Sequence, residues 1–109
     1  MAALCRRFDP ALLLAFHTQG EVIYWRYGDL DVPDARDIAA TFAAVSGYSP
    51  EDTPYDSSFA GYRDWFIRSF RRPGFTIECG KGLNPLPPAD FPEIRRRCLG
   101  ILTLGALVT

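Results

Sequence analysis

Two side chains of this 109-residue sequence are candidates for ligand binding or acid–base chemistry, His17 and Glu78. His17 is the only histidine of the chain, and it directly follows the apolar run at residues 11–16. A residue at the carboxyl end of a strand in an α/β sheet faces the crevice where ligands usually bind. Position alone leaves two interpretations of His17 open, a ligand or catalytic histidine and a structural one. One histidine does not complete a zinc site, which needs three protein ligands.

Glu78 lies within the sequence FTIEC at residues 75–79, which is predicted to be a strand. Central strands disfavour glutamate, so its presence there needs an explanation. One interpretation is an edge strand on which Glu78 faces water. The other is a partly desolvated general base that accepts a proton in a reaction. The residues alone leave both interpretations open.

Strands and helices alternate along the chain, and they must position these two side chains. The continuous apolar run at residues 11–16 predicts a strand buried on both faces, and residues 21–25 (EVIYW) predict a short strand. A helix is expected to start at residues 32–34 and to end at Gly47. Beyond it we expect an irregular segment at 48–61, a helix at 62–70, the strand at 75–79, a Gly/Pro loop at 80–88 and a helix at 90–107. This order predicts an incomplete α/β layer structure, because two principal strands leave sheet edges that need partners.

Helical spacing of apolar residues predicts which faces of the helices pack. The predicted faces comprise Ile38, Phe42 and Val45 in the first helix, Trp65, Phe66 and Phe70 in the second, and Ile94, Cys98, Ile101, Leu102 and Gly105 in the last. Arg63, Arg68, Arg71 and Arg72 surround the second helix. They are interpreted as a solvated basic face, with binding of an anionic group as the alternative.

Composition sets the broad class. With 48% hydrophobic and 23% charged residues the chain is globular, either one domain over residues 1–109 or a piece of a larger one. A net charge of -1 gives no electrostatic case for a nucleic acid or membrane partner. Three widely spaced cysteines form neither a disulfide framework nor a zinc ribbon, so reduced, buried thiols are expected. No signal peptide or membrane-spanning run is recognised, so a cytoplasmic location is expected.

Three ordered segments carry a resemblance to a known family: AFHTQGEVIYW, GYRDWF and RRPGFTIECGKGLNPLP. They resemble the C-terminal half of bacterial zinc carboxypeptidases of the carboxypeptidase A-like metallocarboxypeptidase family. The closest branch is that of the γ-D-glutamyl-L-diamino-acid peptidases, which act on peptidoglycan stem peptides. The resemblance covers residues 8–106 and implies the C-terminal, incomplete portion of a three-layer α/β/α fold with a mixed sheet.

The resemblance also implies roles for individual residues. His17 matches a zinc ligand and Glu78 matches the catalytic glutamate, which takes a proton from the zinc-bound water and passes it to the leaving amine. Tyr55 lies nearest the place of a mobile tyrosine that holds substrate, with Tyr62 as an alternative. Arg63 matches a residue that lines the specificity pocket, where a basic side chain suits a substrate with an extra carboxylate, such as diaminopimelate.

The chain also departs from the family pattern. It has no HxxE motif and lacks the substrate-binding Arg and Asn, so Zn²⁺ would find one ligand, His17. We therefore expect a fragment that needs a companion N-terminal polypeptide or a homo-oligomer, with a peptide substrate only in the complete enzyme. Alone, it should bind zinc weakly, have little activity and be marginally stable. Cys79 is expected to be core, pointing away from the side of Glu78.

Two other interpretations stay open. One is a non-catalytic remnant or interaction module that retains part of the fold. The other, weaker one is an unrelated α/β binding domain in which FHTQG and FTIE occur by coincidence. The order of the three segments argues against coincidence.

Overall fold

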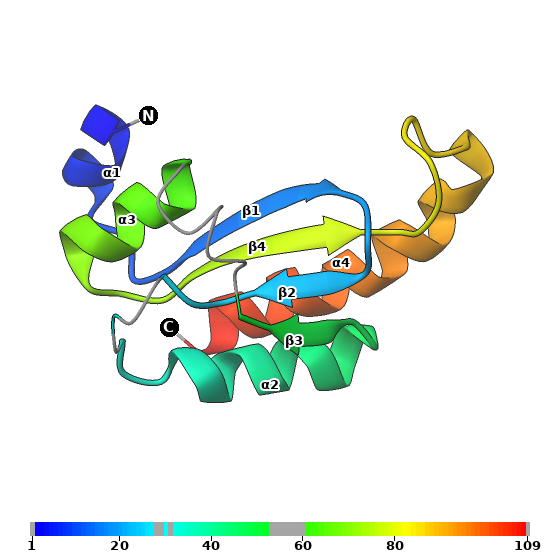
Figure 1. Cartoon of the computed structure of the whole chain (residues 1–109). Helices are drawn as coiled ribbons and strands as arrows, with labels where there is room; N and C mark the ends of the chain where they lie inside the picture. The colour runs from blue at the N-terminus through cyan, green and yellow to red at the C-terminus, as the bar shows by residue number, and fades with distance from the viewer. Residues whose placement is uncertain (1, 28–29, 31, 53–60, 109) are drawn as a thin grey trace.

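The computed structural model describes residues 2–27, 30, 32–52 and 61–108, and these form an α/β structure around a mixed sheet (Figure 1). Within these ranges the sheet has four strands in the order β1-β4-β2-β3. The α/β class and the mixed sheet predicted from the sequence are confirmed. The sheet has one strand more than the three expected, namely β3, and it is compatible with a fragment of a larger α/β fold.

The four strands differ in length and direction. β1 (Leu13–Thr18) runs parallel to β4 (Gly74–Cys79) over six residues each. β2 (Val22–Tyr24) pairs antiparallel to the other side of β4, and β3 (Ser49–Glu51) runs parallel to β2. β3 lies inside the segment predicted to be irregular, because three exposed residues with a central Pro50 carry no period-two apolar signal.

β1 corrects the prediction of a strand buried on both faces. It begins at Leu13 rather than at residue 11, and it lies at the edge of the sheet with β4 as its one neighbour. Its first three residues are half-buried and its last three are exposed. The apolar run predicted burial from composition, but burial on both faces requires elements packed over both faces along the whole strand, and the last three residues of β1 are exposed.

The buried strand that the sequence predicted at residues 11–16 is instead β4, which lies between β1 and β2. Phe75 and Ile77 have no solvent exposure, and they point to the same face as Ile23 of β2, which is the register partner of Ile77. The edge-strand interpretation of Glu78 is therefore wrong, because the strand that carries it is paired on both sides.

Two helices cover the face of the sheet that carries Phe75 and Ile77. α2 (Ala35–Ser46) and α4 (Phe91–Leu107) pack against each other beneath it, and a short 3-10 turn, η2 (Pro88–Asp90), leads into α4 (Figure 1). The core contains Ile23, Ala39, Phe42, Tyr48, Phe75, Ile77, Cys79 and Ile101. The rings of Phe42 and Phe75 meet edge to face, with centroids 5.1 Å apart.

The predicted packing faces are right for most residues and wrong for two. Phe42 and Ile101 are fully buried, whereas Val45 and Leu102 are exposed. Val45 packs at the rim against Gly100, where a Cβ would come within 2.8 Å of its Cγ2. The helix end at Gly47 is confirmed, since that glycine has φ 77° and its N–H donates to the carbonyl of Ala43.

α3 (Tyr62–Phe70) lies on the opposite face of the sheet, which carries Glu78. A Cβ built on Gly74 at the start of β4 would lie 3.0 Å from Ile67 and 3.3 Å from Arg63, so this helix rests on the backbone there. Gly74 and Glu78 share a face because side chains alternate along a strand. The sheet therefore has helices on both faces.

α1 (Ala2–Phe8) was not predicted, and it lies beside α3 (Figure 1). Its Cys5 is buried and contacts the hydroxyl of Tyr62, with Sγ and Oη 2.5 Å apart. No helix in the described part of the chain is long and apolar enough to cross a membrane.

Candidate active site

His17 and Glu78 are register partners in the parallel pair of β1 and β4. Neighbouring strands lie about 4.8 Å apart, and partner side chains point to the same face. Both strands end at the same edge of the sheet, remote from α3 (Figure 1). The only histidine of the sequence and a central-strand carboxylate are thus brought side by side, although 60 residues separate them in the chain.

The two side chains differ in solvent access. His17 is exposed, and it lies inside β1 rather than directly after the strand as predicted. Glu78 is half-buried between β1 and β2, where Val22 is its partner on the β2 side. The half-buried carboxylate of Glu78 is suited to accept a proton, and the exposed imidazole of His17 is suited to contact a ligand.

The loops that follow β1 and β4 are tied together next to this pair. Thr18 donates its hydroxyl to the side-chain oxygen of Asn84 at 2.8 Å, and the Asn84 amide donates to the Thr18 carbonyl at 3.2 Å. The backbone N–H of Gly20 donates to the carbonyl of Gly80 at 2.7 Å. These contacts fix the strand ends that carry His17 and Glu78.

These contacts between Thr18 and Asn84 form a clasp that no sequence pattern predicted. The dipeptide Asn84-Pro85 within the Gly/Pro loop was a signal for an ordered turn. Gly80 is required in it on two grounds. Its φ of 74° is in the left-handed region, and a Cβ there would lie 2.6 Å from Leu86 and 2.9 Å from Ile94. The loop between β4 and η2 is therefore a packed element and not a spacer.

Glu21 and Arg97 attach the loop between β1 and β2 to α4. Arg97 lies 3.7 Å from Glu21 and 2.9 Å from Glu93, and its guanidinium stacks over the ring of Tyr48 at 5.5 Å. Lys81 lies 3.8 Å from Glu21 on the solvent side. This network holds the site end of the sheet on the helix layer.

Arg63 is placed at the other end of the same face. Its guanidinium is buried, pairs with Asp64 at 2.7 Å and donates to the carbonyl of Arg26 at 2.9 Å. Burial lowers the pKa of Arg63, and the Asp64 carboxylate acts in the opposite direction. Arg63 packs next to Gly74, which is four residues before Glu78 on β4, or about 13 Å along the strand. The solvated-face interpretation is wrong for Arg63, and the proposed pocket role stays a prediction.

Tyr62, the alternative substrate-holding tyrosine, is also remote from the pair. It lies at the start of α3, stacks on Trp65 with centroids 5.5 Å apart, and contacts Cys5 of α1. The contact with Cys5 is the largest cause that raises the pKa of Tyr62. Tyr55 lies outside the described residues. Of the predicted site residues, the structure thus brings together His17 and Glu78.

The residues available for a metal are few. Within the described ranges, no three His, Cys, Asp or Glu side chains are grouped to hold a metal ion. His17 supplies one donor at the open face, and Cys79 points to the opposite, core face, as predicted. A zinc site needs three protein ligands, so the described residues fit one corner of such a site and not the whole.

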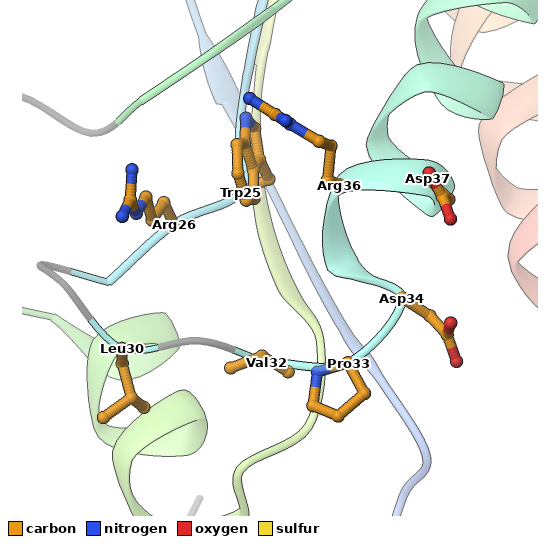
Figure 2. A pocket seen from close by; sticks show the side chains of 8 residues that line it. All are labelled: Trp25, Arg26, Leu30, Val32, Pro33, Asp34, Arg36 and Asp37. Atoms are coloured by element: carbon orange, nitrogen blue, oxygen red, sulfur yellow. The ribbon is translucent and has the colours of Figure 1, made fainter.

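Of the hollows among the described residues, one lies away from His17 and Glu78, and another borders His17. One, of about 420 Å³, precedes α2, and Figure 2 shows Arg36 reaching over Trp25 while Asp34 and Asp37 point away. Its lining residues are Trp25, Arg26, Leu30, Val32, Pro33, Asp34, Arg36 and Asp37. The guanidinium of Arg36 stacks over the ring of Trp25 at 5.8 Å and stabilises the start of α2. The lining of this hollow contains no nucleophile and no pair that matches His17 and Glu78.

The other hollow is an apolar groove of about 670 Å³ between β1 and α4. Its lining residues are Phe16, His17, Thr18, Cys79, Phe91, Ile94, Arg95, Cys98, Leu99 and Leu102. Phe16, Phe91, Leu99 and Leu102 are all exposed there. The groove thus lies beside the edge of β1 that has no partner strand among the described residues.

Comparison with known proteins gives two relatives. The chain is 49% identical over 105 residues to gamma-D-glutamyl-L-diamino acid endopeptidase 1 of Lysinibacillus sphaericus, which covers 96% of the chain and 26% of that protein. It is 43% identical over 102 residues to the Uncharacterized protein YqgT of Bacillus subtilis (strain 168), which covers 94% of the chain and 27% of that protein. The chain thus spans about a quarter of the length of these relatives. No family model matches the sequence.

Proposed function

We propose that this chain is part of a peptidase that hydrolyses γ-D-glutamyl-diamino-acid bonds, related to the carboxypeptidase A-like metallocarboxypeptidases. In this proposal Glu78 is the general base and His17 is one ligand of a catalytic zinc. The observation that carries the proposal is the register pairing of His17 with Glu78 at the carboxyl ends of two parallel strands. The 49% identity to a protein named as an endopeptidase supports the reaction class.

The chemistry proposed for Glu78 follows from its surroundings. It is half-buried at the end of a central strand, and the Thr18–Asn84 clasp fixes the strand ends around it. A carboxylate held in this way can take a proton from an attacking water and return it to the leaving amine. His17, exposed beside it, offers a ring nitrogen at the same open face.

Zinc, when bound, would supply a Lewis acid and a water of lowered pKa. The described residues provide one ligand, so the other ligands would belong to the part of the protein that corresponds to the remaining three quarters of the relatives. The free edge of β1 and the apolar groove next to it support this division. The complete site would then form where that part meets β1.

The activity test uses a chimera. The aligned 105 residues of this chain would replace their counterparts in the Lysinibacillus sphaericus endopeptidase, and hydrolysis of a γ-D-glutamyl-diamino-acid peptide would be followed. Glu78→Gln should lower kcat about 10²- to 10⁴-fold, because it removes the proton acceptor and keeps the side-chain shape. The matched control is Glu51→Gln, an exposed glutamate of β3 that should leave kcat unchanged. Equal effects of the two substitutions would refute the role of Glu78.

The substrate role of Arg63 is tested in the same chimera. We propose that Arg63 favours a substrate with an extra carboxylate, in competition with its present partner Asp64. Arg63→Ala should then weaken the preference for carboxylate-bearing diamino acids, seen as a change in relative kcat/KM. An unchanged preference would remove Arg63 from the pocket, and a general loss of folding would be recognised from the circular dichroism spectrum.

The second candidate is a non-catalytic module that retains part of the fold. The observation that favours it is the lack of a metal-binding group among the described residues. The isolated 109-residue chain should bind zinc weakly and hydrolyse little peptide under either proposal. A chimera that folds and binds zinc but stays inactive would favour the module. Tight, stoichiometric zinc in the isolated chain would contradict both and indicate a site shared between copies.

A further inference from the structure

We propose that Cys79 and Cys98 form a reversible dithiol–disulfide site whose oxidant is a hydroperoxide. The two Sγ atoms lie 3.2 Å apart, one at the end of the central strand β4 and the other on α4. Both cysteines are free. A disulfide needs about 2.05 Å between the sulfurs, so closing the bond requires a movement of about 1.2 Å. This site is independent of the peptidase proposal.

The two thiols are unequal in access. Cys98 is half-buried and lines the open apolar groove together with Arg95, whereas Cys79 is buried at 4% exposure. Contact with the Cys79 thiol lowers the pKa of Cys98, and the same contact, together with burial, raises the pKa of Cys79. Reactive cysteines are thiolates that solvent can reach, so the asymmetry assigns the first step to Cys98.

The reaction balances with one hydroperoxide per pair of thiols. The Cys98 thiolate attacks the peroxide oxygen, the O–O bond breaks, and the alkoxide or hydroxide leaves with a proton as an alcohol or water. Cys98 is then a sulfenic acid. The Cys79 sulfur attacks it, the S–O bond breaks, water leaves, and the S–S bond forms. The two thiols are oxidised by two electrons, and the peroxide is reduced by two.

Cys5 provides the comparison within the molecule. It is also buried, but its partner is the hydroxyl of Tyr62 rather than a thiol. Buried cysteines of that kind are usually inert. The distinctive feature of Cys79 and Cys98 is a second sulfur at contact distance with an open groove beside one of them. Their bond would fasten β4 to α4 at the residue that follows Glu78, on the opposite face of the sheet.

The test is made on the purified, reduced chain with stoichiometric hydrogen peroxide, followed by mass spectrometry. Native protein should lose two hydrogens and yield one disulfide, Cys79–Cys98, which dithiothreitol reverses. The same treatment in guanidinium chloride should give all three pairings, because contact distances no longer select one. A native sample with the same mixture as the denatured one, or with Cys98 oxidised to sulfinic acid while Cys79 stays reduced, would overturn the proposal.

Three variants divide the roles. Cys5→Ser should give the same yield of disulfide as the natural sequence. Cys79→Ser should leave Cys98 to proceed to sulfinic acid or to an intermolecular disulfide, because its resolving thiol is gone. Cys98→Ser should leave Cys79 unmodified at the same peroxide concentration, owing to its burial. Cys79 oxidation in Cys98→Ser at the rate of the natural chain would refute the assignment of Cys98 as the first nucleophile.

Discussion

The two edges of the sheet have opposite character. At one edge, β3 has three exposed residues with Pro50 in the middle and the acidic Glu51 and Asp52 at its end. At the other edge, β1 has six residues without a proline or a carboxylate, next to the groove lined by exposed Phe16, Phe91, Leu99 and Leu102. Short length, proline and charge are the devices by which natural sheets avoid pairing with other chains.

Within the described residues, this contrast separates an edge that is protected against pairing from one that is not. The β3 edge has the proline and charges of a protected outer edge, whereas the β1 edge of the described sheet is apolar and lacks both. The candidate pair His17–Glu78 lies on the β1 side, next to the unprotected edge. A site completed by another strand would be expected at this edge and not at the β3 edge.

The largest expected effect tests whether the groove beside β1 is surface or core. Phe42, with no exposure, packs on Phe75 in the centre of the core, and Phe42→Ala should destabilise the chain by about 3–5 kcal/mol. Phe91 is 61% exposed in the groove, so Phe91→Ala should change the free energy of unfolding by no more than about 0.5 kcal/mol. Urea unfolding measures both. Equal losses would mean that the groove belongs to the core, and the contrast between the edges would fail.

The next effect concerns the anchoring of the β3 edge. Tyr48 precedes β3 and is 2% exposed, and burial raises its pKa from 10.0 to about 12. The pKa of Tyr48 is higher in the folded chain than in the unfolded chain. The neutral phenol therefore contributes its full stability below pH 10, and this contribution is lost as the pH rises through the folded pKa. The loss should approach about 2.7 kcal/mol, the equivalent of two pKa units.

Tyr48→Phe is the matched variant, because it keeps the ring and removes the ionisable hydroxyl. The difference between the urea midpoints at pH 9 and pH 11.5 should be smaller for this variant than for the natural chain. Parallel losses in both proteins would show that other groups cause the alkaline destabilisation. The β3 edge would then be anchored by packing without a contribution from the neutral phenol.

Sequence patterns predicted the fold where the signal was local. The helix with its glycine end at Gly47, the helix over Tyr62–Phe70 and the FTIEC strand depend on side-chain periodicity and turn chemistry, and they are confirmed. β3 was missed because its three polar, exposed residues have no apolar period. The burial of β1 was wrong because an apolar run reports what a strand could bury, and its neighbours decide what it does bury.

For the candidate site, the sequence supplied the residues and the structure supplied their relation. His17 and Glu78 were selected by type and position, but their register pairing depends on β1 and β4 being adjacent, which no local pattern encodes. The contact between Thr18 and Asn84 was missed for the same reason, since it joins two residues that are 66 positions apart in the chain. The proposed roles of Arg63, Tyr62 and Tyr55 require parts of the protein beyond those described.

A smaller effect tests the β1 edge directly. At high concentration the isolated chain should associate through this edge, because its backbone groups and apolar groove are uncovered. Phe16→Lys places a charge beside the edge and should raise the dissociation constant at least about tenfold, or 1.4 kcal/mol. The control is Ser49→Lys on β3, which should change nothing. Sedimentation measurements distinguish them, and equal weakening by both substitutions would contradict the difference between the edges.

The smallest expected effect concerns the helix that forms the groove wall. Glu93 lies at the start of α4 and accepts hydrogen bonds from Arg96 and Arg97, contacts that lower its pKa from 4.5 to about 2. A depressed folded pKa means that the contribution is present above pH 4.5 and is lost as the pH falls through about 2. The Glu93 side chain is exposed to solvent, so salt screens the interaction and its contribution to stability is small.

Glu93→Gln should therefore lower the urea midpoint slightly at pH 7 and low salt. The difference should shrink at high salt and vanish below pH 2, where the natural chain has lost the same charge. Arg97 also contacts Glu21 in the loop after β1, so a larger effect at pH 7 would mean that Glu93 holds Arg97 in place for the site end of the sheet. A difference that persists below pH 2 would assign the effect to the helix start and not to the ion pairs.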